Sequence, residues 1–474
     1  MDNLSLESPV VVDVGSHTLK AGLSINFPND REPSVVRGGE QKNKRRDHQH
    51  WLLSSSSSFV VHRPSSLNLF LYLHQKKTLQ MIPTTLRDEG SKTLRHTMRD
   101  GVVVDWDCLE ALLHRTFYGR LGWEAGEEGA ALFSEQVLTP RRDRERLTSL
   151  CFERFGLAGM FVAESPVLAL YSVGRSSGLV ADVGHDGASV AAVVDGASVA
   201  AGSRRVKSSG GEGEGEKAST SSSSSSAPLG GLAVERALRQ RLAARIGEAK
   251  AAAVPQDLIR VAKHAVCRVA ASSAAAAASA SSSTAAAAAA AAADASNNNS
   301  NAPSTSKHVL PDGTELEVTA ADGVAAGEAL VTPFFSSSSS SSEQGSKKQN
   351  QQQQQQQQQQ HPSLAELLSL ALSSIPDTNS RRLASEALMV CGGGSNVAGL
   401  AARVVAEGGG SLPPSHPAPP PLLAVPDYCP SQMLSTAAWA GGAILARVVF
   451  QQQQHVSRAE YDEFGPTIVH RKAA

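Results

Sequence analysis

Hydrophobic and polar positions fall into two regimes along the chain: blocks with a clear period, and long runs of one residue type. Residues 9–36 carry two apolar runs around a Gly-containing turn, which predicts strand, tight turn and strand. Patterning is strongest over 101–202, where helical periods precede strands at 178–183 and 188–194 and an Asp195-Gly196 hairpin turn. The pattern therefore predicts an α/β fold.

Three helices are expected within this block. Asp105 or Asp107 can cap the first, since a carboxylate accepts from free first-turn N–H groups, and its apolar face is Leu109, Leu112, Leu113 and Phe117. Pro140 opens the second, where its missing N–H costs nothing, and the buried side carries Leu147, Leu150, Cys151 and Phe155. The third, about 164–173, presents Val167, Leu168 and Tyr171 and stops at Gly174.

Shorter patterned blocks follow. Residues 229–270 are expected to be helical, and one piece carries the apolar stripe Leu258, Val261, Ala265 and Val266. Residues 308–335 predict a small hairpin around Pro311-Asp312-Gly313. Helix and strand resume at 363–407, and a folded block ends the chain.

Low-complexity tracts separate these blocks at 203–227, 272–307, 336–361 and 408–421. Such Ser, Ala, Gln and Gly runs cannot bury enough apolar surface to offset the entropy of ordering them, so we expect disordered insertions. Residues 37–95 form an insert without a clear pattern. Its basic cluster at 42–46 is either a nuclear import signal or a solvated loop.

Charge and cysteine usage exclude several classes of protein. The net charge of -1 over 474 residues gives no global attraction to nucleic acid or anionic lipid. Five cysteines stand singly, without metal-ligand spacing, which is typical of a reducing compartment. The N-terminus lacks the pattern of a signal peptide, and the apolar stretch at 437–446 is too short to span a bilayer. We therefore expect a soluble intracellular protein.

One design occurs twice. Val10–Ser16 and Leu179–His185 are each an apolar strand that delivers an aspartate and then a glycine to a tight turn. Glycine lets backbone N–H groups approach phosphate oxygens, and Lys20 supplies a point charge. Asp13 and Asp182 suit a hydrated Mg²⁺ or Ca²⁺, which takes oxygen ligands. One such turn is common in any sheet, so the repetition carries the hypothesis of a phosphate clamp.

A third element runs from an apolar strand into glycines at Met389–Ser395, as at adenine or phosphate sites. Together with the two hairpins, several motifs resemble the actin family. The tail Tyr461–Lys472 is the most specific, and the others are Trp439–Ala446, His114–Tyr118, Leu310–Gly313 and Gly327–Leu330. Within the family, the segments Gly119–Glu124 and Ala446–Phe450 are most like the plant-type nuclear actin-related proteins.

The resemblance implies two similar lobes around ATP, each a ribonuclease H-like domain. The first lobe would comprise 9–174 with the insert 37–95 and the returning segment 437–474, and the second 178–436. It implies ATP or ADP with Mg²⁺ or Ca²⁺, the cation being held through water by Asp13 and Asp182. The nucleotide-binding residues it implies are Asp13, Gly15, Ser16, Lys20, Asp182, Gly184, Lys263, Gly392, Gly393 and Gly394.

The hydrolytic residues of the family are not matched. Ser165, beside Glu164, stands where the family has its water-positioning glutamine, and Ser189 stands where it has a histidine that aligns water. Neighbouring site positions also differ, at His185, His264 and Ser435. Loss of a group that orients the nucleophile removes ~10²–10⁴ in rate. Glu164 is either a substitute base or an exposed polar residue, and we expect an absent or very weak ATPase.

Three functions are compatible with this resemblance. The first is a nucleotide-stabilised, non-filament subunit of a nuclear chromatin-remodelling complex, with partner subunits that include actin or another actin-related protein. It would act in the nucleus, with the cytoplasm as a second compartment, without a membrane and without sequence-specific nucleic-acid binding. The second is a cytoskeletal ATPase that polymerises, which the insert and tracts disfavour. The third, a sugar kinase or chaperone with similar hairpins, is disfavoured by the actin-like tail.

Overall fold

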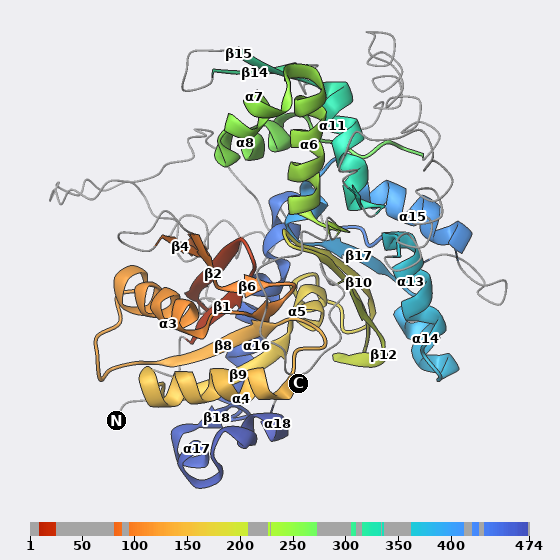
Figure 1. The fold of residues 1–474 in the computed structure, drawn as a ribbon. Coiled ribbons are helices and arrows are strands. Elements are labelled where there is room, and N and C mark those ends of the chain that lie inside the picture. The colour runs from red at the N-terminus through yellow and green to blue at the C-terminus, as the bar shows by residue number, and fades with distance from the viewer. Residues whose placement is uncertain are drawn as a thin grey trace, which may run out of the picture.

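The structure is a computed structural model that describes eleven stretches of the chain. These are residues 9–24, 80–87, 94–206, 226–227, 229–272, 305–309, 315–332, 334–335, 362–411, 420–425 and 431–472. Within them the chain forms two lobes, each built on its own sheet (Figure 1). The α/β, actin-like two-lobed fold that the sequence indicated is therefore confirmed.

The first lobe contains a six-stranded sheet with the order β18-β9-β8-β1-β2-β3. Its strands are β1 (Val10–Val14), β2 (Thr18–Leu23), β3 (Gln80–Pro83), β8 (Ala130–Glu135), β9 (Gly159–Glu164) and β18 (Val456–Ser457). Strand β1 runs antiparallel to β2 and parallel to β8, and β18 brings the C-terminal segment to the edge. Short pairs continue beyond β3: β4 (Thr85–Arg87) with β5 (Leu94–His96), and β6 (Met98–Arg99) with β7 (Val102–Val103).

The second lobe contains a four-stranded sheet with the order β12-β11-β10-β17. Its strands are β10 (Gly178–Val183), β11 (Ala188–Val194), β12 (Ala197–Arg205) and β17 (Leu388–Cys391). As β1 does in the first lobe, β10 pairs antiparallel with the next strand and parallel with a later one. The order β3-β2-β1-β8 thus reappears as β12-β11-β10-β17, so the two central hairpins occupy equivalent places.

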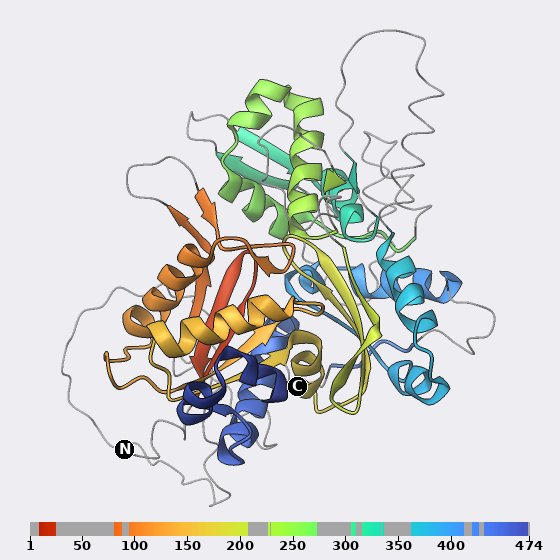
Figure 2. The same cartoon turned by 60° about the horizontal axis from the view of Figure 1, so that its bottom comes forward.

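Helices from both ends of the chain cover the first sheet. These are α3 (Trp106–His114), α4 (Arg141–Ser149), α5 (Ser165–Ser172), α16 (Ala437–Gln451), α17 (Arg458–Phe464) and α18 (Val469–Lys472). Figure 2 shows the C-terminal helices, in dark blue, beside the orange elements of this lobe. Asp105 caps α3 by accepting from the N–H of Cys108 at 2.9 Å. The sequence suggested that Pro140 is the first helical residue of α4, but in the structure it is the N-cap, one residue earlier.

Among the described residues, one helical stretch, Met433–Gln451, is long and apolar enough to cross a membrane. Its apolar residues serve the protein core instead. Trp439 is 2% exposed and donates its indole N–H to the carbonyl of Val11 at 3.2 Å. A Cβ on Gly441 would collide with the backbone of Leu168, so α16 and α5 pack at backbone contact.

The second lobe carries two groups of helices. One comprises α6 (Gly231–Ile246), α7 (Glu248–Ala253), α8 (Gln256–Val266) and α11 (Ala320–Gly327), near the hairpin of β14 (Thr305–Val309) and β15 (Glu315–Thr319). The other comprises α13 (Leu364–Ser373), α14 (Thr378–Ala384) and α15 (Leu400–Ser411), and β13 (Ser226–Ala227) pairs with β16 (Phe334–Phe335). The expected stripe on α8 is wrong at Val261, which is 55% exposed, and it missed Ile259 and Ala262, which face the core. Its other members hold: Val266 is buried, and Leu258 and Ala265 pack partly buried against the core.

Several expected boundaries move. The end of the 37–95 insert belongs to the fold, because β3 pairs with β2. Strand β12 extends to Arg205, inside the tract expected at 203–227, and β14 begins at Thr305, inside 272–307. Strand β13 also lies inside 203–227, and α15 continues to Ser411, inside 408–421, so these ends of the expected tracts are folded as well. Residues 207–225, 273–304, 336–361 and 412–419 lie outside the described residues, as do the basic cluster at 42–46 and the turn at 311–313.

Candidate functional site

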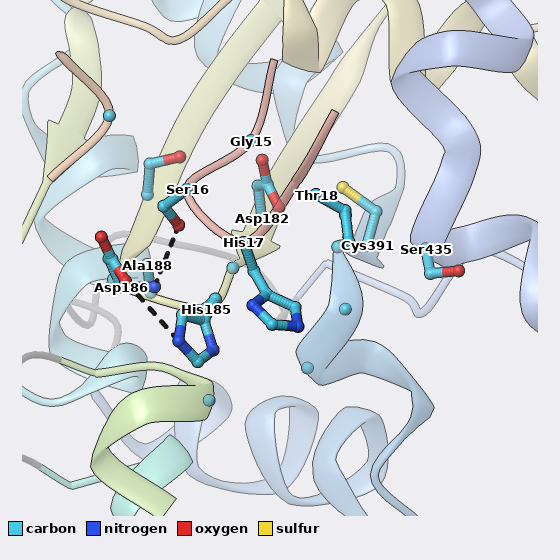
Figure 3. A pocket seen from close by; sticks show the side chains of 18 of the residues that line it. Gly15, Ser16, His17, Thr18, Asp182, His185, Asp186, Ala188, Cys391 and Ser435 are labelled. Carbon is cyan, nitrogen blue, oxygen red and sulfur yellow. Dashed lines mark hydrogen bonds and ion pairs between the residues drawn. The ribbon is translucent and has the colours of Figure 1, made fainter. Parts of the chain in front are cut away.

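The two hairpins place their aspartates at matching positions. Asp13 pairs with Lys20 across β1 and β2, and Asp182 pairs with Ser189 across β10 and β11, each near the end of its ladder. Both turns close alike: the N–H of Gly15 donates to Thr18 O at 3.1 Å, and that of Gly184 to Gly187 O at 2.9 Å. Both turns face one cleft between the lobes (Figure 3).

This cleft has a volume of about 380 Å³ and gathers all ten residues that the sequence indicated for a nucleotide. They come from four segments of the two lobes: Asp13, Gly15, Ser16, Lys20, Asp182, Gly184, Lys263, Gly392, Gly393 and Gly394. The positions where the chain departs from the family pattern, His185, Ser189, His264 and Ser435, line it too. Residues over 370 positions apart in the chain thus share one cavity.

Two side chains fix the position of the Asp13 carboxyl group. Its Oδ2 lies 2.6 Å from Lys20 Nζ, and its Oδ1 accepts from the hydroxyl of Ser134 at 2.5 Å. Burial alone would lower the pKa of Lys20, but the adjacent Asp13 outweighs it and the pKa is raised. Lys20 therefore stays charged in the cleft and neutralises one of the two carboxylates.

Asp182 lacks this compensation. Burial raises its pKa, and the negative charge of Asp13 raises it further, against the partial effect of Lys20. Gln136 Nε2 approaches Asp182 Oδ2 at 3.4 Å from the first lobe. Two carboxylates that share one buried lysine provide the excess negative charge and the oxygen ligands that suit a hydrated Mg²⁺ or Ca²⁺. The donor set thus fits a cation held through water.

The three glycines of the turn after β17, residues 392–394, have different surroundings. Gly392 has φ +84°, and a Cβ there would collide with the carboxylate of Asp182. A Cβ on Gly394 would collide with the side chain of Val183. Gly393 has no neighbour within 4 Å of a Cβ and faces open space in the cleft. The turn therefore packs closely on the second hairpin while leaving exposed backbone towards the cavity.

Lys263 is positioned by a buried partner that local sequence patterns do not reveal. Its Nζ lies 2.6 Å from Glu235 Oε1 on α6, and Glu235 is 1% exposed. Burial would raise the pKa of Glu235, but Lys263 outweighs it and the pKa is lowered. Gln256 donates to the other oxygen at 2.5 Å, and Arg260 Nε lies 3.7 Å away. This cluster fixes Lys263 at the cleft wall.

The residues that take the place of the hydrolytic groups are not arranged as a base. The Ser165 hydroxyl lines the cleft but donates to the carbonyl of Glu135 at 2.9 Å. Glu164 does not line the cleft, and its carboxylate accepts from the hydroxyl of Ser198. Glu164 is half-buried at the end of β9, so it is not the exposed residue of one interpretation, and it does not line the cleft as the substitute base of the other would.

Sequence interpretation missed two residues that line the cleft, Gln136 and His17, and the buried partner of Lys263, Glu235. Gln136 follows a buried strand, and Glu235 lies in the first turns of a helix, which were the only signals available. Among the described residues there is no cluster of three or more His, Cys, Asp or Glu side chains arranged to bind a metal directly. The four described cysteines are free and buried, and Cys391 lies in the cleft wall.

Comparisons with known proteins agree with this geometry. The model of the family described as "Actin" matches residues 5–474 of this chain. Actin-related protein 7 of Arabidopsis thaliana is 29% identical over 463 residues, covering 98% of this chain and 99% of that protein. Actin-related protein 7 of Oryza sativa subsp. indica is 28% identical with the same coverage. Actin-like protein 7B of Homo sapiens is 24% identical over 389 residues, 82% of this chain and 75% of its own. The chain belongs to the actin family, as an actin-related protein.

Proposed function

We propose that the protein binds ATP or ADP with Mg²⁺ or Ca²⁺ chiefly as a structural ligand, and that it acts as a non-filament subunit of a nuclear chromatin-remodelling complex. The observation that carries the nucleotide part is the convergence of Asp13 and Asp182, at equivalent strand ends of two lobes, on one glycine-lined cleft. Each carboxylate belongs to a different lobe, so a ligand between them would join the two lobes.

The residues suited to each part of the ligand are separate. Asp13 and Asp182 would hold the cation through water, and Lys20 with the N–H groups of the Gly15 and Gly184 turns would meet the phosphates. Lys263 and the exposed backbone at Gly393 would face the nucleoside. When bound, the nucleotide with its cation supplies the charge balance that the two buried carboxylates lack.

A mainly structural role follows from what lies around this site. Ser165 is too short to orient a water as a glutamine would, and its hydroxyl is used by the backbone. A ligand that binds only the folded state stabilises it by about 4 kcal/mol at a thousand times its dissociation constant. That is a large share of a typical stability of about 5–15 kcal/mol. Binding without turnover is therefore of use to the protein.

The partner and compartment are proposed from likeness. Two of the relatives reported above are plant actin-related proteins that match over almost the whole chain. The 42–46 basic cluster suits nuclear import. The long tracts that interrupt the second lobe disfavour packing into a filament, and actin or another actin-related protein is among the subunits we expect beside it.

Two assays test the nucleotide part. Mg-ATP at a hundred times its dissociation constant should stabilise the protein by about 2.7 kcal/mol, or about 5–11 °C in Tm at about 2–4 °C per kcal/mol. Phosphate release should stay at the background of the assay. Release at the rate of conventional actin measured in parallel would refute the structural role while leaving binding intact.

Two further assays test the cellular part. In a pelleting assay with Mg-ATP and salt, the protein should remain in the supernatant while actin sediments. Affinity purification from nuclei should recover subunits of a chromatin-remodelling complex. Sedimentation of the protein alone would favour the alternative, a polymerising cytoskeletal ATPase.

A further inference from the structure

The tips of the two hairpins touch each other across the cleft. The N–H of Asp186 donates to the Ser16 hydroxyl at 3.3 Å, and the rings of His17 and His185 lie 4.7 Å apart between centroids, inclined by 33°. Figure 3 shows the two imidazoles side by side, one from each turn. Both rings line the cavity, at the place where a phosphate tail between the hairpins would lie.

Charged groups of both signs face this pair. Asp186 and Glu235 each have a carboxylate oxygen 3.9 Å from a ring nitrogen of His185. Lys263 and Arg260, on α8, interact electrostatically with both rings, and His264 does so with the ring of His17. Burial lowers the pKa of both imidazoles, Glu235 opposes this, and the nearby cations add to it, so that the pKa of His185 is lowered to about 3. The stacked rings are therefore neutral near pH 7 when no anion is present.

We propose that His17 and His185 are anion-binding residues that meet the polyphosphate of the ligand and take up at least one proton from solvent as it binds. This inference rests on the proposed nucleotide binding and deepens it, because it assigns a role to the side chains at the tips of the two hairpins. Affinity for the polyphosphate then becomes dependent on pH.

The balance of charge in the cleft supports this role. Both lysines that line it are already paired at 2.6 Å, Lys20 with Asp13 and Lys263 with Glu235. Arg205 and Arg260 also line the cleft, which gives four side-chain cations against five carboxylates: Asp13, Asp100, Asp182 and Asp186 in the lining and Glu235 behind Lys263. The empty cleft therefore has no excess of positive charge with which to meet a polyphosphate. Nearby phosphate charges favour the protonated imidazole, and each protonated ring offers two N–H donors.

A soft metal ion is the less suitable occupant of this pair. Among the described residues no third His, Cys, Asp or Glu completes a metal-binding group. A purely structural contact is also less suitable, since both histidines lie at the tips of cavity-lining turns and not in the core.

The sign of the pH effect follows from proton linkage. The free imidazoles are neutral and the bound ones gain a proton, so the ligand binds more tightly as pH falls. Uptake of one proton changes the dissociation constant about tenfold per pH unit. Protonation of the nucleotide itself contributes equally to every variant and cancels in their comparison.

The test is isothermal titration calorimetry with Mg-ATP at pH 6, 7 and 8, in two buffers of different ionisation enthalpy, on the full chain. His185→Gln and His17→Gln should each lower the number of protons taken up, flatten the pH dependence and weaken binding about tenfold at pH 6. His114→Gln is the matched control, because His114 is exposed on α3 and its ring also lies 4.7 Å from an aromatic ring, that of Tyr118.

The outcomes separate this inference from the function on which it rests. If Mg-ATP binds and both cleft variants keep the wild-type proton count and pH slope, the inference is wrong and nucleotide binding stands. If neither the wild type nor any variant binds Mg-ATP, both the proposed nucleotide binding and the role of the histidines are wrong. Titration with Mg-tripolyphosphate, which lacks the nucleoside, should give the same dependence on both histidines. A dependence seen with ATP alone would overturn the assignment to phosphate.

Discussion

Lys20 holds together two carboxylates that would otherwise repel in a buried cleft. The Lys20–Asp13 pair has a separation of 2.6 Å, with side chains 14% and 8% exposed. Breaking a buried pair by removing one partner costs about 3–5 kcal/mol, because a charge remains buried without compensation. For Lys20→Met in the absence of nucleotide we therefore expect a Tm lower by about 6–20 °C, at about 2–4 °C per kcal/mol.

A second substitution makes this prediction specific to charge. Asp182→Asn in the Lys20→Met background should recover part of the lost stability, because it removes the other carboxylate. Asp182→Asn alone should stabilise the nucleotide-free protein at pH 7.5, since burial and Asp13 disfavour the charge it removes. A side chain that destabilises the ligand-free protein is typical of a functional site, where binding and not stability determines which residue is present.

The pH dependence has a definite sign. Without Lys20, the folded-state pKa of Asp182 moves further above its unfolded value, so the folded state binds protons more readily. The stability deficit of Lys20→Met should therefore shrink as pH falls from 7.5 to 5. The assay is urea unfolding followed by circular dichroism at each pH.

Lys472 provides the matched control. Its ammonium lies 2.9 Å from Glu460, but the two side chains are 25% and 32% exposed. Removal of such a pair costs at most about 1 kcal/mol. If Lys20→Met cost no more than Lys472→Met, the argument that the cleft contains buried, mutually repelling carboxylates would be refuted.

Three further outcomes are expected. Gly392→Ala should destabilise the fold by about 1–3 kcal/mol, because of its positive φ and the collision with Asp182, whereas Gly393→Ala should be near neutral by the same unfolding assay. Glu164→Gln should leave both Mg-ATP affinity and phosphate release unchanged, and a loss of either would restore Glu164 as a functional base. The pKa of His185 is lowered from its reference value of 6.5 to about 3 in the folded state. Its contribution to the free energy of unfolding is therefore present above pH 6.5 and is lost as pH falls below that value. His185→Gln should therefore gain on wild type below pH 6.5, by at most about 1.4 kcal/mol per pH unit, and parallel pH profiles would contradict this.

Local sequence patterns were sufficient to predict a structural feature where the interaction that causes it lies between residues close in sequence. Asp-x-Gly after a buried strand predicts a hairpin in both lobes, and the register of Asp13 and Asp182 follows from it. Asp105 caps α3 because the free N–H groups of the first turn lie beside it in sequence. The tail motif was sufficient for the family because it is long and specific.

Where the cause is a distant neighbour, sequence patterns were insufficient. Val261 and Ile259 each belong to a stripe with helical spacing on α8, and only the packing partner decides that Ile259 faces the core. Glu235 meets Lys263 across 28 positions, and Gln136 meets Asp182 across the two lobes. Such contacts depend on how elements pack, which no local period encodes.

Calorimetric titration of Mg-ATP into wild type, Asp13→Asn, Asp182→Asn and Asp195→Asn tests the central claim most directly. Asp195 lies in the β11–β12 turn with φ +49°, a conformation that Asn tolerates, so it controls for loss of an aspartate elsewhere. The wild type and Asp195→Asn should bind alike, and the two cleft variants should each bind at least about tenfold more weakly, a loss of about 1.4 kcal/mol. Equal affinity in all four proteins, or no heat from the wild type, would contradict a nucleotide held between the lobes.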